Sequence, residues 1–306
     1  RPMDCPGAIL GYKEDLRSYR DFPLRWSELG IVYRNEKSGE LHGLLRVQHI
    51  TQDDAHIFIS EDMIEDEVTE VLKIMQEIYE PFGLKTEVFL STRPDDAMGD
   101  PKIWAKAEKA LANALKKNKI GYGLKEKDGA FYGPKIDIHV KDSLGRTWQT
   151  GTIQLDFFMP EKFSLKYIDK EGKEKQPVIV HRALMGSLER FIGILIEHYA
   201  GAFPVWLAPV QVKIISVGEG HIEFCQKLAG DFRKEDVRVE VDKSNETVGN
   251  KIRKAVGEKT PYVLVVGDKE MGSANLAVRD RGEQKTREVD KEKFIAEVKE
   301  KIKSRK

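Results

Sequence analysis

The sequence predicts an α+β protein built on an antiparallel sheet with flanking helices, followed by a small α/β region with a mixed sheet. Two observations support this prediction. Strand patterns joined by turns dominate the earlier part of the 306 residues, and strands and helices alternate regularly after two nearby prolines, Pro204 and Pro209. We therefore expect two domains, residues 1–206 and residues 207–306.

Two hairpins predict the sheet of the first domain. Residues 31–34 and 41–50 flank a polar turn, and residues 53–60 continue as a further extended segment. In the second hairpin, apolar and polar residues alternate over 135–140, and the chain returns over 147–157 after a turn that contains glycine. These strands are expected to share one sheet.

Helices are expected where apolar residues recur at a spacing of three or four. In the first domain they lie at 61–80, 102–117 and 187–199. In the second domain we expect helices at 221–235, 247–258 and 290–303, and strands at 212–217, 237–241, 262–266 and 274–278. A regular alternation of strand and helix is typical of an α/β sheet.

The composition excludes several classes of protein. The chain is 40% hydrophobic and 33% charged, so it can bury a core, and its longest apolar runs fall far short of the ~18 residues of a membrane span. Only two cysteines, Cys5 and Cys225, exclude a disulfide scaffold and fit a reducing compartment, so we expect a cytoplasmic protein. The 51 basic and 51 acidic side chains cancel, although residues 207–306 are mildly basic.

Three separate segments contain residues that bind metals. Cys5, His56 and His181 could form a zinc site that leaves a fourth position open. Their separations of 51 and 125 residues are unlike those of zinc fingers, and with seven histidines in the chain a trio of this kind arises easily by chance. Spacing alone therefore leaves both interpretations open.

Three arginines are candidates for binding an anion. Arg34 stands at the end of an expected strand, Arg46 on the expected return strand, and Arg190 in the first turn of the third helix. A guanidinium on a rigid element suits phosphate, because its planar fork donates two hydrogen bonds and keeps its charge. A surface ion pair is the alternative for each of them. No GxGxxG, GKS or GKT run occurs, which argues against Rossmann and P-loop nucleotide sites.

Longer runs of residues place these candidates in motifs. Arg34-Asn35-Glu36 is followed by a loop, by LHGLLRV at 41–47 and by TQDDAH at 51–56, and a second run, HRALMGSLERFIG, occupies 181–193. The two runs resemble the second and third signatures of the class II aminoacyl-tRNA synthetases in their threonyl form. Further runs that match this family in the same order lie at 5–7, 131–135, 148–156 and 206–209. The resemblance covers essentially the whole chain.

This resemblance implies a class II catalytic domain over residues 1–206 and an anticodon-binding domain over residues 207–306. The implied activity is the formation of threonyl-adenylate from threonine and ATP, followed by transfer of the threonyl group to tRNA(Thr). The implied cofactors are one Zn²⁺ per chain, held by Cys5, His56 and His181 and completed by the amino and hydroxyl groups of threonine, and Mg²⁺ bound with ATP. An open zinc ion favours an amino alcohol over the branched alkyl side chain of valine.

The resemblance also implies roles for single residues. Arg34 would contact the α-phosphate of ATP, and Arg46 and Arg190 its outer phosphates. Arg34 and Arg190 would carry the catalysis, and Glu36 would face the adenine amino group. The residues implied for the amino-acid pocket are Gln52, Asp54, Tyr132, Gln149 and Gln154, those for the anticodon are Asn245, Glu270 and Arg279, and further phosphate candidates are Lys251, Arg253 and Lys254.

Two residues depart from the family pattern. Ile50 stands where members often have a phenylalanine that stacks on adenine, and Ala8 stands where a histidine is common. The first class II signature, which forms most of the dimer interface, and the serine-editing domain are expected to precede Arg1. A homodimer is therefore expected of the longer protein.

Two other functions are alternatives to this one. A non-catalytic relative that binds tRNA or DNA is expected to lose the phosphate-binding arginines or the metal trio, and this chain has both. A synthetase for proline or serine is disfavoured by the trio together with the run at 51–56. Both observations favour the threonine enzyme.

Overall fold

The computed structural model describes residues 1–305, and the chain forms two compact units, Arg1–Ile194 and Leu195–Lys306. The division falls within helix α5 (Leu188–His198), ahead of the two prolines that mark the predicted boundary. The last turn of α5 and the proline-containing linker therefore belong to the second unit.

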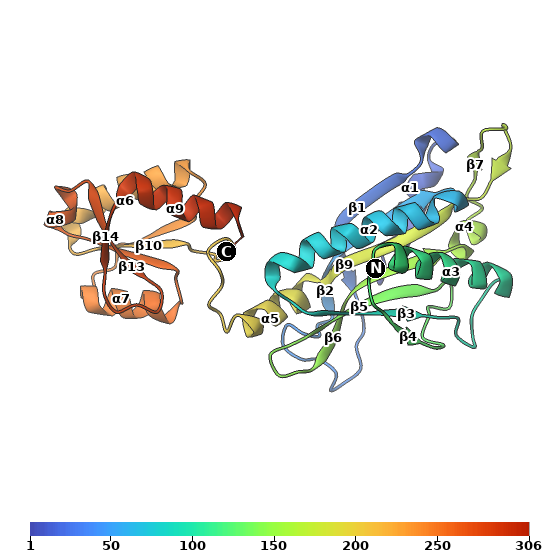
Figure 1. Cartoon of the computed structure of the whole chain (residues 1–306), viewed down its shortest axis with the longest axis horizontal. Coiled ribbons are helices and arrows are strands. Elements are labelled where there is room, and N and C mark those ends of the chain that lie inside the picture. Colours follow the sequence, from blue (N-terminus) through green and yellow to red (C-terminus); the bar gives the residue numbers. More distant parts are fainter. Residues whose placement is uncertain (306) are drawn as a thin grey trace. The chain divides into compact units, whose positions relative to one another are not determined.

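Unit 1 contains a seven-stranded sheet with the strand order β1-β2-β9-β6-β5-β3-β4 (Figure 1). Its strands are β1 (Leu24–Tyr33), β2 (His49–Ile59), β3 (Thr86–Ser91), β4 (Gly123–Lys125), β5 (Lys135–Lys141), β6 (Thr147–Asp156) and β9 (Val178–Ser187). Every neighbouring pair is antiparallel except β3 and β4, which run parallel. The predicted antiparallel sheet with flanking helices is thus confirmed.

Helices α2 (Ile64–Tyr79) and α3 (Pro101–Lys117) pack against each other and cover one face of this sheet (Figure 1). Apolar residues at helical spacing, such as Val68, Leu72 and Leu111, are completely buried. Full burial of one such side chain contributes about 1.5–3 kcal/mol to the stability of the fold. Both helices lie where the apolar spacing predicted them.

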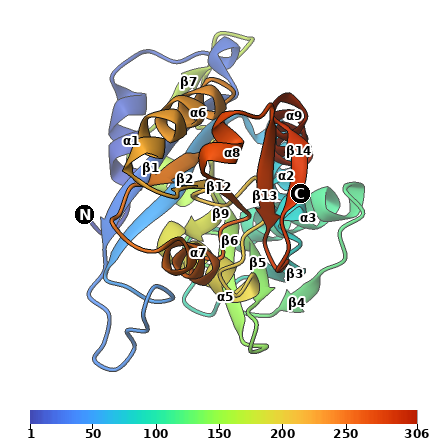
Figure 2. The ribbon, with the colours of Figure 1, turned by 90° about the vertical axis from the view of Figure 1, so that its left-hand side faces the viewer.

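Helix α1 (Cys5–Lys13), which the sequence analysis did not predict, lies on the other face of the sheet (Figure 2). Its Ile9 and Tyr12 are buried against Phe58 of β2, and the rings of Tyr12 and Phe58 stack with their centroids 4.6 Å apart. A proline in the first turn favours a helix start there, because its missing N–H would have had no partner inside the helix. The packing fixes Cys5 at the first position of α1.

Shorter elements complete unit 1. Helix α4 (Phe158–Lys162) follows β6, and β7 (Tyr167–Ile168) and β8 (Glu174–Lys175) form a separate antiparallel hairpin. Single 3₁₀ turns lie at Tyr19–Asp21, Glu61–Met63 and Glu80–Phe82.

One strand prediction is wrong in its extent. The predicted strand at 41–50 starts only at His49, and Arg46 lies in the preceding loop rather than on the return strand. The segment turns back on itself, since the backbone N–H groups of Leu45 and Arg46 both donate to the carbonyl of His42, and Gly43 adopts a positive φ of 49°. The apolar residues that suggested a strand, Leu41 and Leu44, remain about half exposed.

Unit 2 contains a five-stranded sheet with the order β11-β10-β12-β13-β14. Its strands are β10 (Val212–Ser216), β11 (Val239–Asp242), β12 (Tyr262–Val266), β13 (Asn275–Asp280) and β14 (Arg287–Asp290), and its helices are α6 (Ile222–Lys234), α7 (Val248–Gly257), α8 (Asp268–Met271) and α9 (Lys291–Lys303), with a 3₁₀ turn at Glu219–His221. β10 runs parallel to both of its neighbours, whereas β13 is antiparallel to β12 and β14. The mixed sheet is confirmed, and β14 and α8 were not predicted.

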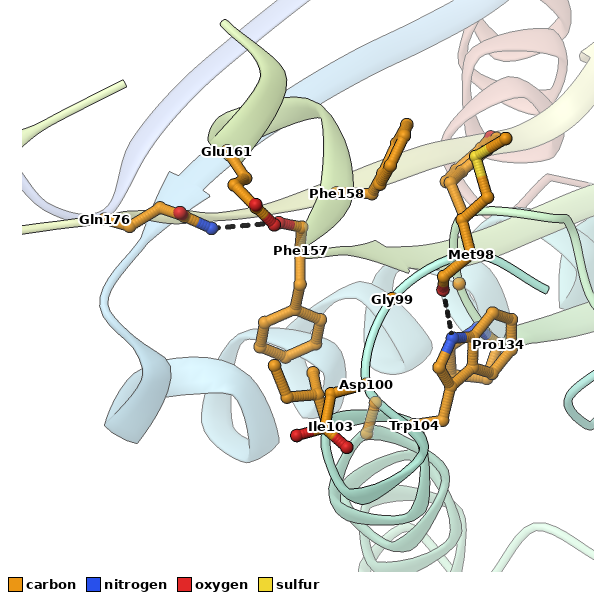
Figure 3. Close-up of a pocket in the computed structure, with 13 residues that line it drawn as sticks. Met98, Gly99, Asp100, Ile103, Trp104, Pro134, Phe157, Phe158, Glu161 and Gln176 are labelled. Carbon is orange, nitrogen blue, oxygen red and sulfur yellow. Dashed lines mark hydrogen bonds between the residues drawn. The ribbon is translucent and has the colours of Figure 1, made fainter. Parts of the chain in front are cut away.

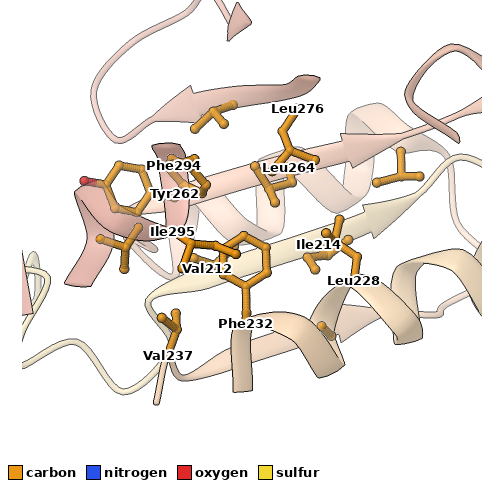
Figure 4. Packing of buried hydrophobic residues seen from close by; sticks show 14 of the residues in the cluster. Val212, Ile214, Leu228, Phe232, Val237, Tyr262, Leu264, Leu276, Phe294 and Ile295 are labelled. Atoms are coloured by element: carbon orange, nitrogen blue, oxygen red, sulfur yellow. The ribbon is translucent and has the colours of Figure 1, made fainter. Parts of the chain in front are cut away.

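Each face of this sheet is covered by helices from unit 2. Helices α6 and α9 share a core with β10 and β12 on one face, and α7 packs on the other (Figure 2). Ile214, Phe232, Leu264 and Phe294 meet at the centre of the larger core (Figure 4). Cys225 is completely buried in this cluster, which gives it a packing role.

Within residues 1–305, none of the helices combines the length and the apolar character that crossing a bilayer requires.

Candidate active site

Three neighbouring strands of unit 1 carry polar side chains at matched positions. His56 on β2 lies opposite His181 on β9, and His181 in turn lies opposite Gln154 on β6. Directly paired residues of adjacent strands point to the same face of a sheet. Two residues along each strand, and so on the same face, Ala183 of β9 pairs with Asp54 of β2 and with Thr152 of β6. Strand register thus brings widely separated parts of the sequence into one polar surface.

Helix α1 adds Cys5 to this surface. The Sγ atom of Cys5 and one ring nitrogen each from His56 and His181 all lie within 4.8 Å of one another. Nε2 of His56 and Nδ1 of His181 are buried and have no hydrogen-bond partner among the described residues 1–305. A buried polar atom without a partner is costly, and a bound metal ion would remove that cost for both rings at once. The structure therefore assembles the predicted trio in a form that fits a metal.

The two histidines differ in how their surroundings treat positive charge on the ring. Burial, and then the neighbouring His181, lower the pKa of His56 to about 3, which keeps this ring in the neutral form that binds metals. His181 uses its other ring nitrogen, Nε2, in a 2.9 Å hydrogen bond with Asp156. Burial lowers the pKa of His181, but the interaction with Asp156, and after it that with Cys5, outweighs burial and raises that pKa to about 10. Asp156 therefore stabilises positive charge at this ring.

Asp156 is itself held rigidly. It is completely buried, and its Oδ1 accepts the backbone N–H groups of Phe158 and Met159, at the start of α4. A carboxylate that orients the second nitrogen of a ligating histidine is a recurrent feature of zinc sites. Sequence analysis did not single out Asp156, because its partner His181 is 25 residues away and becomes a neighbour only through the sheet.

Replacing Asp156 by asparagine is expected to weaken zinc binding by about 10- to 100-fold, because the carboxylate that orients His181 is lost while the Oδ1 acceptor remains. Competition with a chromophoric zinc chelator measures the affinity. The matched control is Asp169→Asn, since Asp169 also accepts two backbone N–H groups but lies in the β7–β8 turn. Equal zinc affinity in both variants and in the unaltered protein would contradict a role for Asp156 in a zinc site.

A cavity of about 90 Å³ opens beside the trio. The predicted residues that line it are Cys5, Arg34, Gln52, Asp54, Tyr132, Gln154 and His181. The Tyr132 hydroxyl donates a 2.8 Å hydrogen bond to the Gln154 side-chain carbonyl. Burial raises the pKa of Asp54 to about 7, so placing a positive charge next to this carboxylate is favourable. Four of the five predicted amino-acid-pocket residues are thus brought together.

Gln149 is the predicted pocket residue that does not line this cavity. Its side-chain N–H donates to Oδ1 of Asp137 at 2.7 Å, and its backbone carbonyl accepts from Arg190. Asp137 is completely buried and also accepts hydrogen bonds from Ser91 and Thr152. This network, which sequence analysis missed, continues the polar face of the sheet onto β5.

The arginines surround one end of the site. Arg34 follows β1 directly, and its guanidinium has no hydrogen-bond or ion-pair partner among residues 1–305. Arg46 pairs with Glu36 and Glu40, both at 2.7 Å, and this pairing lowers the pKa of Glu36. The structure therefore places the predicted adenine-facing Glu36 against a predicted phosphate-binding arginine.

Arg190 is positioned by three contacts. Its Nε donates to the carbonyl of Leu45 at 2.7 Å, a terminal nitrogen donates to the carbonyl of Gln149 at 2.8 Å, and the guanidinium lies 5.5 Å from the ring centroid of Trp148. Burial, and then the charges of Arg46 and Arg34, lower the pKa of Arg190. Arg190 is therefore near enough to Arg46 and Arg34 for their positive charges to act on it.

Asp53 shapes the end of β9 that leads to Arg190. The pairing of β2 with β9 is irregular at Asp53, and its carboxylate accepts the backbone N–H groups of Leu184, Met185 and Gly186 at 2.8–3.1 Å. Gly186 has a φ of +69°, and a Cβ atom there would clash with the carbonyl of Thr150. Sequence analysis placed Asp53 in a motif but missed this role.

In unit 2, Asn245 lines a cavity of about 430 Å³ together with Ser216, Gly218 and Lys251. The cavity lies at the carboxyl ends of the parallel strands β10 and β11, the edge at which open α/β sheets bind ligands. The buried Lys251 ammonium donates to the carbonyl and hydroxyl oxygens of Ser216 at its floor.

The other two predicted anticodon residues lie outside this cavity. Glu270 in α8 accepts the backbone N–H of Gly267, and Arg279 on β13 lines a separate cavity of about 100 Å³. The structure therefore distributes the three predicted residues along the sheet of unit 2.

Both units match known families. Residues 1–199 match the family described as tRNA synthetase class II core domain (G, H, P, S and T), and residues 211–301 match the family described as Anticodon binding domain. Curated relatives named threonine--tRNA ligase include those of Clostridium kluyveri, 52% identical over 302 residues, and Carboxydothermus hydrogenoformans, 53% identical over 305 residues. These matches cover 99% and 98% of this chain but 47% and 48% of the relatives, so the chain spans about half their length.

Solved structures show the same likeness. The RNA binding domain of threonyl-tRNA synthetase from Cryptosporidium parvum Iowa II is 38% identical with a TM-score of 0.91, and the match covers 98% of this chain and 76% of that one. The putative threonyl-tRNA synthetase ThrRS-1 from Aeropyrum pernix is 33% identical with a TM-score of 0.78, and the match covers 100% of this chain and 74% of that one.

Proposed function

Because the chain belongs to the threonyl-tRNA synthetase family of class II tRNA synthetases, we propose that it activates threonine with ATP and transfers the threonyl group to tRNA(Thr). The observation that carries this proposal is the metal-binding trio with two unpartnered ring nitrogens, placed beside a polar cavity that also contains a free arginine. A site for an amino alcohol and a site for a phosphate thereby share one small space.

In this proposal Cys5, His56 and His181 hold one Zn²⁺. When bound, the zinc ion supplies a Lewis acid with an open position for the amino and hydroxyl groups of threonine. The Asp54 carboxylate favours the amino end of the substrate by its charge, and Gln52 contributes a further polar contact. The hydrogen bond between Tyr132 and Gln154 fixes the opposite wall of the pocket.

The first chemical step joins threonine to AMP. A carboxylate oxygen of threonine forms a bond to the α-phosphorus of ATP while the bond from that phosphorus to the bridging oxygen of pyrophosphate breaks and pyrophosphate leaves. The Mg²⁺ that accompanies ATP would neutralise part of the phosphate charge. Arg34, free to donate, stabilises the charge on the α-phosphate, and Arg190 is fixed for the outer phosphates. Arg46 also binds the outer phosphates, and to do so it gives up its ion pairs with Glu36 and Glu40. Catalysis here is positioning and charge stabilisation, so no side-chain nucleophile is required.

The second step and the choice of tRNA use the rest of the chain. A hydroxyl of the terminal ribose of tRNA attacks the carbonyl carbon of the adenylate, and AMP leaves. We place the anticodon on unit 2 at Asn245, Glu270 and Arg279, with Lys251 at the floor of the Asn245 cavity. We also propose a homodimer of the longer protein and a cytoplasmic location.

Amino-acid specificity tests this function directly. In protein that contains these 306 residues, ATP–pyrophosphate exchange is expected to be fastest with threonine, and slower with serine by roughly 10- to 200-fold, because serine keeps both metal-binding groups and lacks one methyl. Valine lacks the hydroxyl and is expected to give almost no exchange. Zinc quantitation on the same protein accompanies the assay. Exchange with valine at the rate seen with serine would exclude metal-based recognition of the hydroxyl.

A further inference from the structure

A second cavity in unit 1 adjoins the amino-acid cavity and is mainly apolar. It has a volume of about 200 Å³ and lies between α3, the turn at residues 131–134 and the start of α4 (Figure 3). Its apolar walls are Ile103, Trp104, Ala107, Pro134, Phe157 and Phe158. Tyr132 lines both cavities. None of the residues proposed for ATP or the metal lines this second cavity.

The polar groups around this cavity are mostly satisfied within the protein. The Trp104 indole N–H donates to the carbonyl of Met98 at 2.7 Å, and the Gln176 amide donates to the carbonyl of Phe157 at 2.9 Å (Figure 3). The interior therefore offers an occupant apolar and aromatic contact rather than hydrogen bonds. An apolar cavity of about 150 Å³ is sufficient to hold benzene. The space here suits one six-membered aromatic ring with a short side chain.

The charged residues at the exposed edge of the cavity, its rim, determine which charge on the ligand is favoured. The charged side chains that line the cavity are Asp100 and Glu161, and both are exposed. Oδ1 of Asp100 accepts the backbone N–H of Lys102, which leaves Oδ2 available. Lys162 is also near, since its ammonium lies 5.0 Å from the ring centroid of Phe158. The charged side chains that line the cavity itself are both carboxylates, which favours a cationic group on the ligand.

We propose that this cavity binds a small aromatic amine, with its ring between Trp104 and Phe157 and its ammonium group at Asp100 and Glu161. The site is separate from the proposed threonine and ATP sites. It meets them at Tyr132, whose hydroxyl holds Gln154, so an occupant would contact the back of the amino-acid pocket.

Three probes of one size test the proposed chemistry. Phenethylamine, 2-phenylethanol and 3-phenylpropionate carry the same ring with a positive, a neutral and a negative end. Isothermal titration and ligand-observed NMR are expected to rank them in that order, with phenethylamine about tenfold tighter than 3-phenylpropionate because the rim charge changes from attractive to repulsive. Absence of saturable phenethylamine binding, or equal binding of all three probes, overturns the proposal.

Variants locate the binding within the protein. Ala107→Leu fills the cavity from α3 and is expected to weaken phenethylamine binding at least tenfold, and Ile103→Trp provides a second filling variant at the less buried edge. Ala105→Leu is the matched control, because Ala105 is exposed on the same helix and does not line the cavity. Unchanged binding in both filling variants overturns the assignment to this cavity.

Two further variants separate this proposal from the proposed function. Glu161→Gln is expected to weaken phenethylamine binding about two- to fivefold, as for a solvent-exposed ion pair, and to leave 2-phenylethanol unchanged. Cys5→Ser is expected to retain phenethylamine binding whatever its effect on metal or threonine, because Cys5 lies outside the apolar cavity. Loss of phenethylamine binding in Cys5→Ser would place the probe in the amino-acid site and overturn the proposal.

Discussion

Arg34→Ala is expected to slow threonyl-adenylate formation on the order of a hundredfold or more while leaving the melting temperature unchanged. The Arg34 guanidinium lines the amino-acid cavity and has no hydrogen-bond or ion-pair partner within residues 1–305. Its removal therefore breaks no hydrogen bond or ion pair within residues 1–305. In the proposed function it removes a charge-assisted donor from the α-phosphate, which gains charge in the transition state. ATP–pyrophosphate exchange with threonine measures the rate.

The control for this substitution is Arg20→Ala. Arg20 is also exposed in unit 1, but it contacts only the neighbouring Tyr19 ring and hydroxyl and the Ser18 hydroxyl at the 3₁₀ turn. Its replacement is expected to leave the exchange rate within a few-fold of the original. A similarly small change for Arg34→Ala, with an unaltered melting temperature, would reduce Arg34 to a surface residue.

Cys5→Ser is expected to remove most of the bound zinc and, with it, most threonine activation. The trio could supply three ligands, and only the cysteine can bring a thiolate, which binds zinc at about 2.3 Å and neutralises part of its charge. A serine hydroxyl is a poor substitute at neutral pH. Elemental analysis of protein purified without a chelator gives the zinc content, and pyrophosphate exchange gives the activity.

Cys225→Ser separates a ligand effect from a general thiol effect. Cys225 is buried among apolar residues of unit 2, so its replacement is expected to lower stability and keep one zinc per chain. Full threonine activation by metal-free Cys5→Ser protein would show that the ligand set is wrong. Anomalous scattering from zinc at any place other than the trio would show the same.

The elements that sequence predicted well are those with a one-sided apolar pattern. Helices α2 and α3 each bury one face, and the hairpin of β5 and β6 alternates, so periodicity located them. Strand β9 has buried residues on both faces because it is central, so its sequence shows no alternation of apolar and polar residues to detect. Helix α1 was missed for a related reason, since a Pro-Gly start and only two buried residues give a weak pattern.

In the candidate site, too, residues that belong to local motifs were predicted, and residues that act through distant pairings were not. Motif residues located Cys5, His56 and His181, and the structure brings them together. Asp53 and Asp156 were not singled out, because each acts on backbone N–H groups or on a ring that is distant in sequence. Pairings of this kind depend on strand register, which local patterns do not specify. The loop that carries Arg46 was mistaken for a strand because exposed leucines resemble core positions until the neighbouring elements are known.

The matched positions of His56 and His181 also have a consequence for folding. These residues are 125 positions apart, and only the direct pairing of β2 with β9 brings them together, so the site depends on contacts of high sequence separation, which form slowly. A slip of one residue between the strands would turn His56 to the face covered by α2 and α3. A chain emerging from the ribosome therefore lacks the proposed metal site until β9 has been synthesised and has paired with β2 in register. The strand that enters the centre of the sheet last is thus the one that brings the third candidate ligand, His181, into place.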